Sequence, residues 1–157
     1  MHAERDIKQT VGLLGGESTI QFRITDAMDA HDALLQGLPA GALLHLVSTV
    51  SFLEQDEVLQ RAMGISLRTL QRHKSRRREA RQEPQRLSVE QSNRTWRFAE
   101  VFGHAIEVMG SKQAAEAWMN EPAIGLANRK PLDLMATSAG LEALDEYLTR
   151  LEFGVYT

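Results

Sequence analysis

Cysteine is absent from the 157 residues of this chain, and no long apolar run is present. Without cysteine the chain can form no disulfide, no thiol nucleophile and no thiolate zinc site. The longest apolar stretch, around residues 42–50, is far shorter than the roughly 20 residues that a transmembrane helix needs. The first residues carry acids as well as bases without an apolar run behind them, so no signal peptide is predicted. We therefore expect a soluble, cytoplasmic protein without membrane contact.

Patterns for catalysis and metal binding are also missing. None of the five histidines lies at a metal-ligand spacing such as His-Glu-x-x-His. The sequence has no Gly-x-Ser-x-Gly elbow, and the Gly-Gly-Glu-Ser of residues 15–18 lacks the lysine of a phosphate-binding loop. We therefore expect no enzyme, no cofactor and no metal site.

Positive charge is concentrated in one short window, although the net charge of the chain is only −3. Residues 1–60 contain three Lys or Arg and nine acids, residues 61–86 contain nine and two, and residues 87–157 contain six and ten. Such a block is typical of a surface that binds a polyanion. The alternative is a solvated, arginine-rich helix face. The basic residues of the window are Arg61, Arg68, Arg72, Lys74, Arg76, Arg77, Arg78, Arg81 and Arg86.

A helix-turn-helix pattern enters this basic block. Apolar residues recur at helical spacing between residues 43 and 63. Gly64 is suited to end a helix in the left-handed conformation, Ile65 to plug the turn, and Ser66 to cap the next helix. In this motif the second helix lies in the major groove of DNA.

The predicted second helix presents two leucines on one face and polar residues on the other. Arg68 and Arg72 suit bidentate contacts with guanine, and Gln71 suits adenine. The basic residues after them are expected to neutralise phosphates. The predicted DNA-binding residues are Ser66, Arg68, Thr69, Gln71, Arg72, Lys74, Arg76, Arg77 and Arg78.

A break over residues 79–91 separates the basic block from the C-terminal half. Pro84 interrupts any helix there, and Ser88 with Gln91 predicts a capping box for a new one. The helix that follows, over residues 92–109, is more apolar than a single core-facing stripe requires. We expect it to be buried within its own domain, and a role in a dimer interface is the alternative.

Further helices are predicted over residues 112–119, capped by Ser111, and over 139–151, capped by Thr137 or Ser138. Near the N-terminus, the alternating residues 19–24 predict a strand that pairs across a dimer or lies extended, and Asp26 predicts the cap of a helix over 27–36. The expected units are an N-terminal extension over 1–36, a helix-turn-helix domain over 37–82, and a C-terminal domain over 88–157.

Five stretches of the C-terminal half resemble the toxin-binding domain of the Xre/MbcA/ParS antitoxin family. They are residues 92–94, 114–119, 124–134, 136–140 and 150–156. The helix-turn-helix over 59–72 is similar to the Xre-type element that precedes this domain, so the resemblance covers about residues 38–157. One departure is Ala127-Asn128, where the family often has two glycines.

The resemblance implies an all-α protein, with an Xre-like helix-turn-helix followed by a helical toxin-binding domain. It implies a type II antitoxin that binds a cognate toxin, commonly an NAD-consuming RES-domain protein, and represses its own operon. Operator DNA, a second copy of the chain and the toxin are the implied partners.

The toxin contacts are expected on the loop and tail of the C-terminal domain. An acidic C-terminal part complements a basic, phosphate-binding active site, and a mobile tail is suited to enter it. The alternative is that Phe153 and Tyr156 pack onto their own domain. The predicted toxin-binding residues are Leu126, Asn128, Arg129, Glu152, Phe153, Gly154, Val155 and Tyr156.

Two other functions remain open at this point. The chain could be a stand-alone helix-turn-helix regulator with a C-terminal dimerisation or effector domain. It could also be an adaptor that positions chromosomes or marks cell poles. An antitoxin should copurify with the product of a neighbouring gene, whereas an adaptor should form foci in cells.

Overall fold

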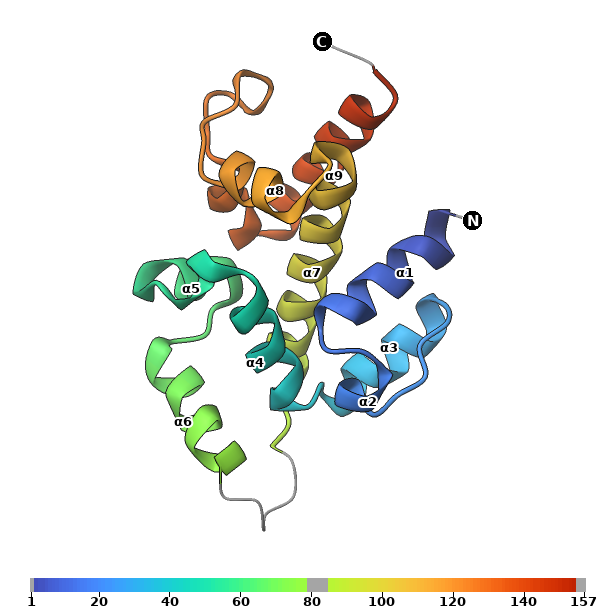
Figure 1. Cartoon of the computed structure of the whole chain (residues 1–157), viewed down its shortest axis with the longest axis vertical. Coiled ribbons are helices and arrows are strands. Elements are labelled where there is room, and N and C mark those ends of the chain that lie inside the picture. The colour runs from blue at the N-terminus through green and yellow to red at the C-terminus, as the bar shows by residue number, and fades with distance from the viewer. Residues whose placement is uncertain (1, 79–84, 155–157) are drawn as a thin grey trace.

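The computed structural model describes residues 2–78 and 85–154, and all the regular structure in this part of the chain is helical (Figure 1). The expected all-α class is therefore confirmed. Two isolated antiparallel bridges, Pro39 with Arg86 and Ala123 with Arg129, are the β contacts found in it. None of the described helices is long and apolar enough to cross a membrane.

The N-terminal extension consists of α1 (His2–Leu13), α2 (Glu17–Ile20) and α3 (Ala27–Gln36). The side chain of Asp26 accepts a hydrogen bond from the Asp29 N–H at 2.8 Å, so the predicted cap of α3 is confirmed. The strand expected over residues 19–24 is wrong. Its first two residues belong to α2, and the rest find no partner strand, which an isolated strand needs.

The middle of the chain forms α4 (Ala40–Thr49), the 3-10 helix η1 (Ser51–Glu54), α5 (Asp56–Met63) and α6 (Leu67–Arg78). All six buried residues of α4 are apolar, and the helix contacts α6 and α2. Helix α6 is mostly polar, so it has little apolar surface of its own to bury. Its position therefore depends on packing against the apolar face of α4.

The C-terminal half forms α7 (Val89–Met109), α8 (Lys112–Met119), η2 (Ile124–Leu126), η3 (Pro131–Ala136) and α9 (Ser138–Glu152). The predicted caps are present here too. Ser88 and Gln91 form the capping box of α7, Ser111 caps α8, and Thr137 caps α9.

Helix α7 is the centre of the molecule. It contacts α1, α3 and α5 as well as α8 and α9, so a single core runs through both halves of the chain. Phe98 and Phe102 on α7 stack with ring centroids 5.9 Å apart, and Phe52 meets Phe102 edge-on at 6.4 Å. The apolar excess of α7 is thus explained by burial within the chain, as expected.

Candidate DNA-binding and protein-binding surfaces

Helices α5 and α6 form a helix-turn-helix whose turn is built as the sequence predicted. Gly64 adopts the left-handed conformation at φ 67°, and its N–H donates to the Gln60 carbonyl at 2.8 Å. Ile65 is buried in the turn, with 1% of its surface exposed. The Ser66 hydroxyl accepts a hydrogen bond from the Thr69 N–H at 3.1 Å and so caps α6.

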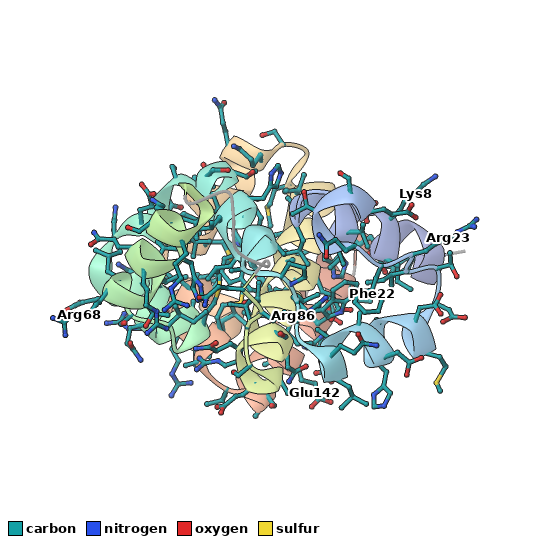
Figure 2. All side chains as sticks on the ribbon, turned by 90° about the horizontal axis from the view of Figure 1, so that it is seen from below. Lys8, Phe22, Arg23, Arg68, Arg86 and Glu142 are labelled. Carbon is teal, nitrogen blue, oxygen red and sulfur yellow. The ribbon has the colours of Figure 1, made fainter. Side chains whose placement is uncertain are left out.

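The two faces of α6 have opposite character. Leu70 and His73 are buried on the inner face, whereas the outer face exposes four long polar side chains. In the view from below, Arg68 points away from the body of the molecule (Figure 2). These exposed residues follow helical spacing, so they form one stripe that a major groove can accept. They are Arg68, Gln71, Arg72 and Arg76.

His73 is a buried polar group on the inner face of this helix. Burial lowers its pKa, and the positive charges of Arg72 and Arg76 lower it further, whereas a hydrogen bond from the imidazole to the Gln85 side chain raises it. Its Nδ1 atom has no hydrogen-bond partner within the described residues. His73 is therefore neutral near pH 7 and acts as part of the support of α6.

The basic block divides between folding contacts and a free surface. Arg61 pairs with Asp133 at 2.7 Å, and the Arg86 side chain donates to the Gly37 carbonyl at 2.9 Å. Lys74, which we expected on phosphate, instead pairs with Glu54 at 2.5 Å. Each side chain of that pair is about half exposed, so the contact is weak. It nevertheless directs the Lys74 ammonium group toward Glu54 and away from the outward stripe.

The remaining predicted DNA-binding residues are placed less directly. The Ser66 hydroxyl is occupied by the cap and by a 3.0 Å hydrogen bond to the Thr69 hydroxyl, so Ser66 positions the helix. Thr69 is half-buried and keeps its own hydroxyl proton for an acceptor. The backbones of Arg77 and Arg78 end α6, and their side chains lie outside the described part of the chain.

Arg94 joins the helix-turn-helix to the C-terminal half, a role that was not predicted from the sequence, where Arg94 is part of a family motif. Its guanidinium donates to the carbonyls of Arg61 and Ala62 at 3.1 Å, at the end of α5. It also donates to the carbonyl of Ala136, at the end of η3, at 3.4 Å. These carbonyls lack partners inside their own helices, so a single cation on α7 satisfies both helix ends.

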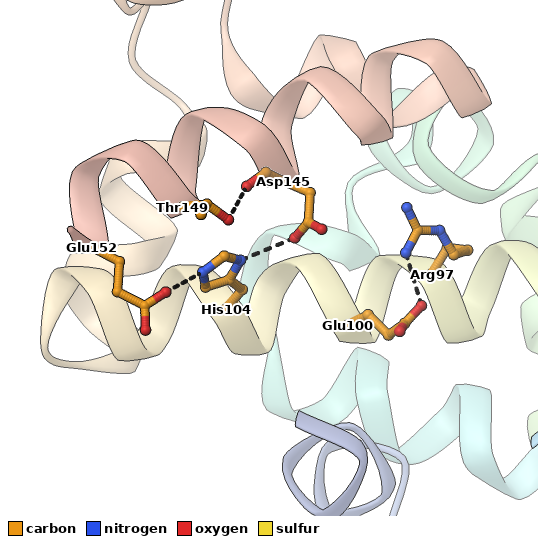
Figure 3. A network of polar contacts seen from close by, with 6 residues as sticks. All are labelled: Arg97, Glu100, His104, Asp145, Thr149 and Glu152. Atoms are coloured by element: carbon orange, nitrogen blue, oxygen red, sulfur yellow. Dashed lines mark hydrogen bonds and ion pairs between the residues drawn. The ribbon is translucent and has the colours of Figure 1, made fainter. Parts of the chain in front are cut away.

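A histidine also links α7 to α9. The Nδ1 atom of His104 lies 2.9 Å from an Asp145 oxygen, and its Nε2 atom lies 3.0 Å from Glu152 (Figure 3). The hydrogen bond with Asp145, supported by Glu152, raises the pKa of His104 to about 9 against the effect of burial, and the pKa of Asp145 is lowered in turn. His104 is therefore charged at neutral pH and binds the last turn of α9.

The residues expected to bind the toxin are only partly on one surface. Asn128 and Arg129 are exposed on the loop before η3, but Leu126 is 7% exposed and supports that loop from within. Glu152 ends α9 in contact with His104, so it is not part of a mobile tail. Phe153 and Gly154 follow as exposed residues, and Val155 and Tyr156 lie outside the described residues.

Ala127 and Asn128 both adopt the left-handed conformation, at φ 57° and φ 60°. Glycine does this freely, whereas alanine does so at a cost of roughly 1 kcal/mol. Ala127 and Asn128, which stand where the family often has two glycines, therefore keep a backbone conformation that suits glycine.

Comparison with known proteins agrees with this division into two surfaces. Residues 29–100 match the family described as "Antitoxin Xre-like helix-turn-helix domain". Residues 104–154 match "Antitoxin Xre/MbcA/ParS C-terminal toxin-binding domain". The two matches meet inside α7, about a dozen residues beyond the gap (residues 83–87) between the two units expected from the sequence, in keeping with the shared core.

Two curated proteins are similar over much of the chain, and both are named "Antitoxin Xre". The one from Yersinia enterocolitica is 34% identical over 98 residues. That match covers 62% of this chain and 62% of the relative, so less than two thirds of the relative's length is matched. The one from Photorhabdus laumondii subsp. laumondii is 25% identical over 138 residues, which is 87% of each chain.

Proposed function

Because the chain belongs to the Xre/MbcA/ParS antitoxin family, a family of antitoxins and not of enzymes, we propose that it neutralises a toxin encoded beside it and represses its own operon. The toxin we propose is an NAD-consuming RES-domain protein, as the resemblance implies. The observation that carries the proposal is the outward stripe on α6, which lies within the helix-turn-helix match.

The division of labour within that stripe follows from its geometry. Arg68, Gln71 and Arg72 lie in the first part of α6, where helix-turn-helix proteins meet base edges. Arg76 lies a further turn along and is placed for phosphate. Each chain carries one such helix, and a two-fold operator requires two of them, so we propose that a dimer binds DNA.

The toxin would be held at the other end of the molecule. Figure 1 places α6 at one end of the long axis, and the loop between α8 and η3 with the end of α9 at the opposite end. This separation supports simultaneous binding of DNA and toxin. The tail after α9 is the segment that we propose enters the toxin active site.

The experiment is co-expression with the product of the adjacent gene. We expect the toxin to stop growth when expressed alone, and the antitoxin to restore growth and copurify with it. Full-length protein should also retard a fragment of its own promoter. A chain that retards the promoter, binds no neighbouring product and forms no foci would instead be a stand-alone regulator.

Tail entry needs a separate variant. Removal of residues 153–157 leaves Glu152 and its contact with His104 in place, so the fold should persist. We expect the truncated chain to bind the toxin yet to leave part of its activity. Full neutralisation by the truncated chain would contradict tail entry and leave the rest of the proposal standing.

A further inference from the structure

The most exposed large apolar side chain of the described residues is Ile124, at 89% exposed. It lies at the start of η2, on the loop between α8 and η3. A single exposed isoleucine needs no explanation by itself, because much of any protein surface is apolar. What needs an explanation is that the loop carrying this exposed side chain is held in a fixed shape.

The loop is closed by its own backbone. The Ala123 N–H donates to the Arg129 carbonyl at 3.1 Å, and the Asn128 N–H donates back to the Ala123 carbonyl at 2.9 Å. The Leu126 N–H also donates to Ala123, at 3.0 Å, and Leu126 is buried beneath the loop. Two left-handed residues, Ala127 and Asn128, complete the turn. The loop is therefore a fixed shape and not a flexible connection.

The loop is also pressed onto the domain through an aromatic contact. A Cβ atom added to Gly125 would lie 2.3 Å from the Tyr147 ring, so only glycine permits this approach. Tyr147 in turn stacks on Trp118, with centroids 6.3 Å apart and ring planes at 3°. The neighbour of Ile124 is thus fixed to both α8 and α9, and Ile124 has a defined position while its side chain faces solvent.

A hollow of about 250 Å³ adjoins the loop. Apolar side chains of Leu134 and Ala143 and the Tyr147 ring line it, together with the charged side chains of Arg129, Arg150 and Glu146. Neither arginine is in an ion pair within the described residues. The lining of the hollow therefore has a surplus of positive charge, in a C-terminal region that is acidic as a whole.

We propose that Ile124 and this hollow form the anchoring point for the toxin. The partner that fits is a protein surface with an apolar side chain that packs on Ile124 and enters the hollow, flanked by carboxylates that reach Arg129 and Arg150. The hollow lies within the stretch that matches a toxin-binding domain, which commits the site to the toxin. The inference rests on the proposed function, and it adds Ile124 to the contact residues expected from the sequence.

The test compares Ile124→Asp with Met28→Asp in full-length protein. Met28 is 69% exposed on α3, so both changes place a carboxylate on an exposed apolar position. The purified product of the adjacent gene is the probe, and its dissociation constant is measured for each variant and for the wild type. We expect Ile124→Asp to weaken binding at least tenfold and Met28→Asp to change it less than twofold, with equal melting temperatures.

A second variant tests the hollow itself. Ala143 is exposed on α9, and Ala143→Phe would fill the space without burying a polar group. We expect at least a tenfold loss of toxin affinity with an unchanged helical circular dichroism spectrum. If both Ile124→Asp and Ala143→Phe bind within twofold of wild type, the anchoring point is overturned while the antitoxin function stands. If the wild type itself fails to bind, the proposed function and this inference fail together.

Discussion

The helix-turn-helix half and the C-terminal half of this molecule each contain a histidine that packs against a neighbouring element, and only one of the two is charged at neutral pH. His73 supports α6 among arginines and is held neutral by burial and by those charges. His104 joins α7 to α9 between two carboxylates and is held positive. In each half the histidine takes the state that its surroundings require, so the sorting of charge along the sequence extends into the interior.

Polar contacts as well as the shared apolar core hold the two halves together. Polar contacts between the helix-turn-helix domain and the C-terminal half include Arg61 with Asp133 and the Arg94 contacts, and further bonds join Ser51 to Glu116 and Lys112 to the Thr49 carbonyl. We expect Arg94→Met to lower the free energy of unfolding by about 2–3 kcal/mol, since it leaves carbonyls at two helix ends without a donor. Urea denaturation measures this. Arg97→Met, which removes a partly buried pair with Glu100 one turn along α7 and a positive charge near Asp145, should cost less than about 1 kcal/mol.

Substitutions on α6 should affect DNA binding alone. Arg68→Ala and Arg72→Ala should each weaken operator binding by about 1–3 kcal/mol, and Arg76→Ala should weaken all sequences alike. Lys74→Ala is the matched control, because Lys74 is already paired with Glu54 and should cost less. Gel retardation on operator and unrelated DNA measures both effects. Equal losses of operator affinity for Arg72→Ala and Lys74→Ala would contradict the distinction between the outward stripe on α6 and the basic residues that make contacts within the protein.

The histidine of the C-terminal half predicts a loss of stability at high pH. The folded pKa of about 9 for His104 exceeds the unfolded value of 6.5, so its contribution is complete below pH 6.5 and disappears as the pH rises through 9. Since Asp145 is half exposed, we expect a contribution of about 1–2 kcal/mol. Thermal unfolding between pH 6 and 10 should show this slope, and His104→Gln should flatten it.

His73 predicts a loss of stability at low pH, opposite to the loss at high pH expected from His104. Its folded pKa is below 6.5, so the unfolded chain takes up a proton first and stability falls as the pH drops below 6.5. Thermal unfolding of the wild type and of His73→Gln between pH 7 and 5 measures this fall in stability. A wild-type curve as flat as that of the variant would contradict the neutral, buried state.

The smallest effect concerns the left-handed residues. The helix-turn-helix uses Gly64 for its left-handed position, whereas the loop between α8 and η3 uses Ala127. We expect Ala127→Gly to raise the free energy of unfolding by about 0.5 kcal/mol. Ala117→Gly, on the exposed side of α8, should lower it by about 1 kcal/mol. The same sign for both changes would contradict the strain assigned to the loop.

Local signals in the sequence predicted much of the fold because their causes are local. The caps at Asp26, Ser66 and Ser88 depend on a hydroxyl or carboxylate within three residues of a backbone N–H, and each is present. The left-handed end at Gly64 depends on one residue type. The alternating pattern of residues 19–24 predicted a strand wrongly, because a local pattern does not show whether a second strand is available, and residues 2–78 and 85–154 contain none.

The candidate surfaces were harder to predict, because long-range pairing decides which charges are free. The sequence could not show that Lys74 meets Glu54, or that Arg94 reaches three carbonyls far from it in the chain. Nor could it show that Leu126 faces inward while Ile124 faces out. The outward position of Arg68 and Arg72 was predictable, since it follows from the helical period alone.

The most direct test of two separate surfaces is the double variant Arg68→Ala/Arg72→Ala, assayed in parallel for promoter binding and for rescue from the adjacent gene product. We expect promoter retardation to disappear while growth rescue and copurification stay at the wild-type level. A folded double variant that still retards the promoter, or that loses rescue together with retardation, would contradict it.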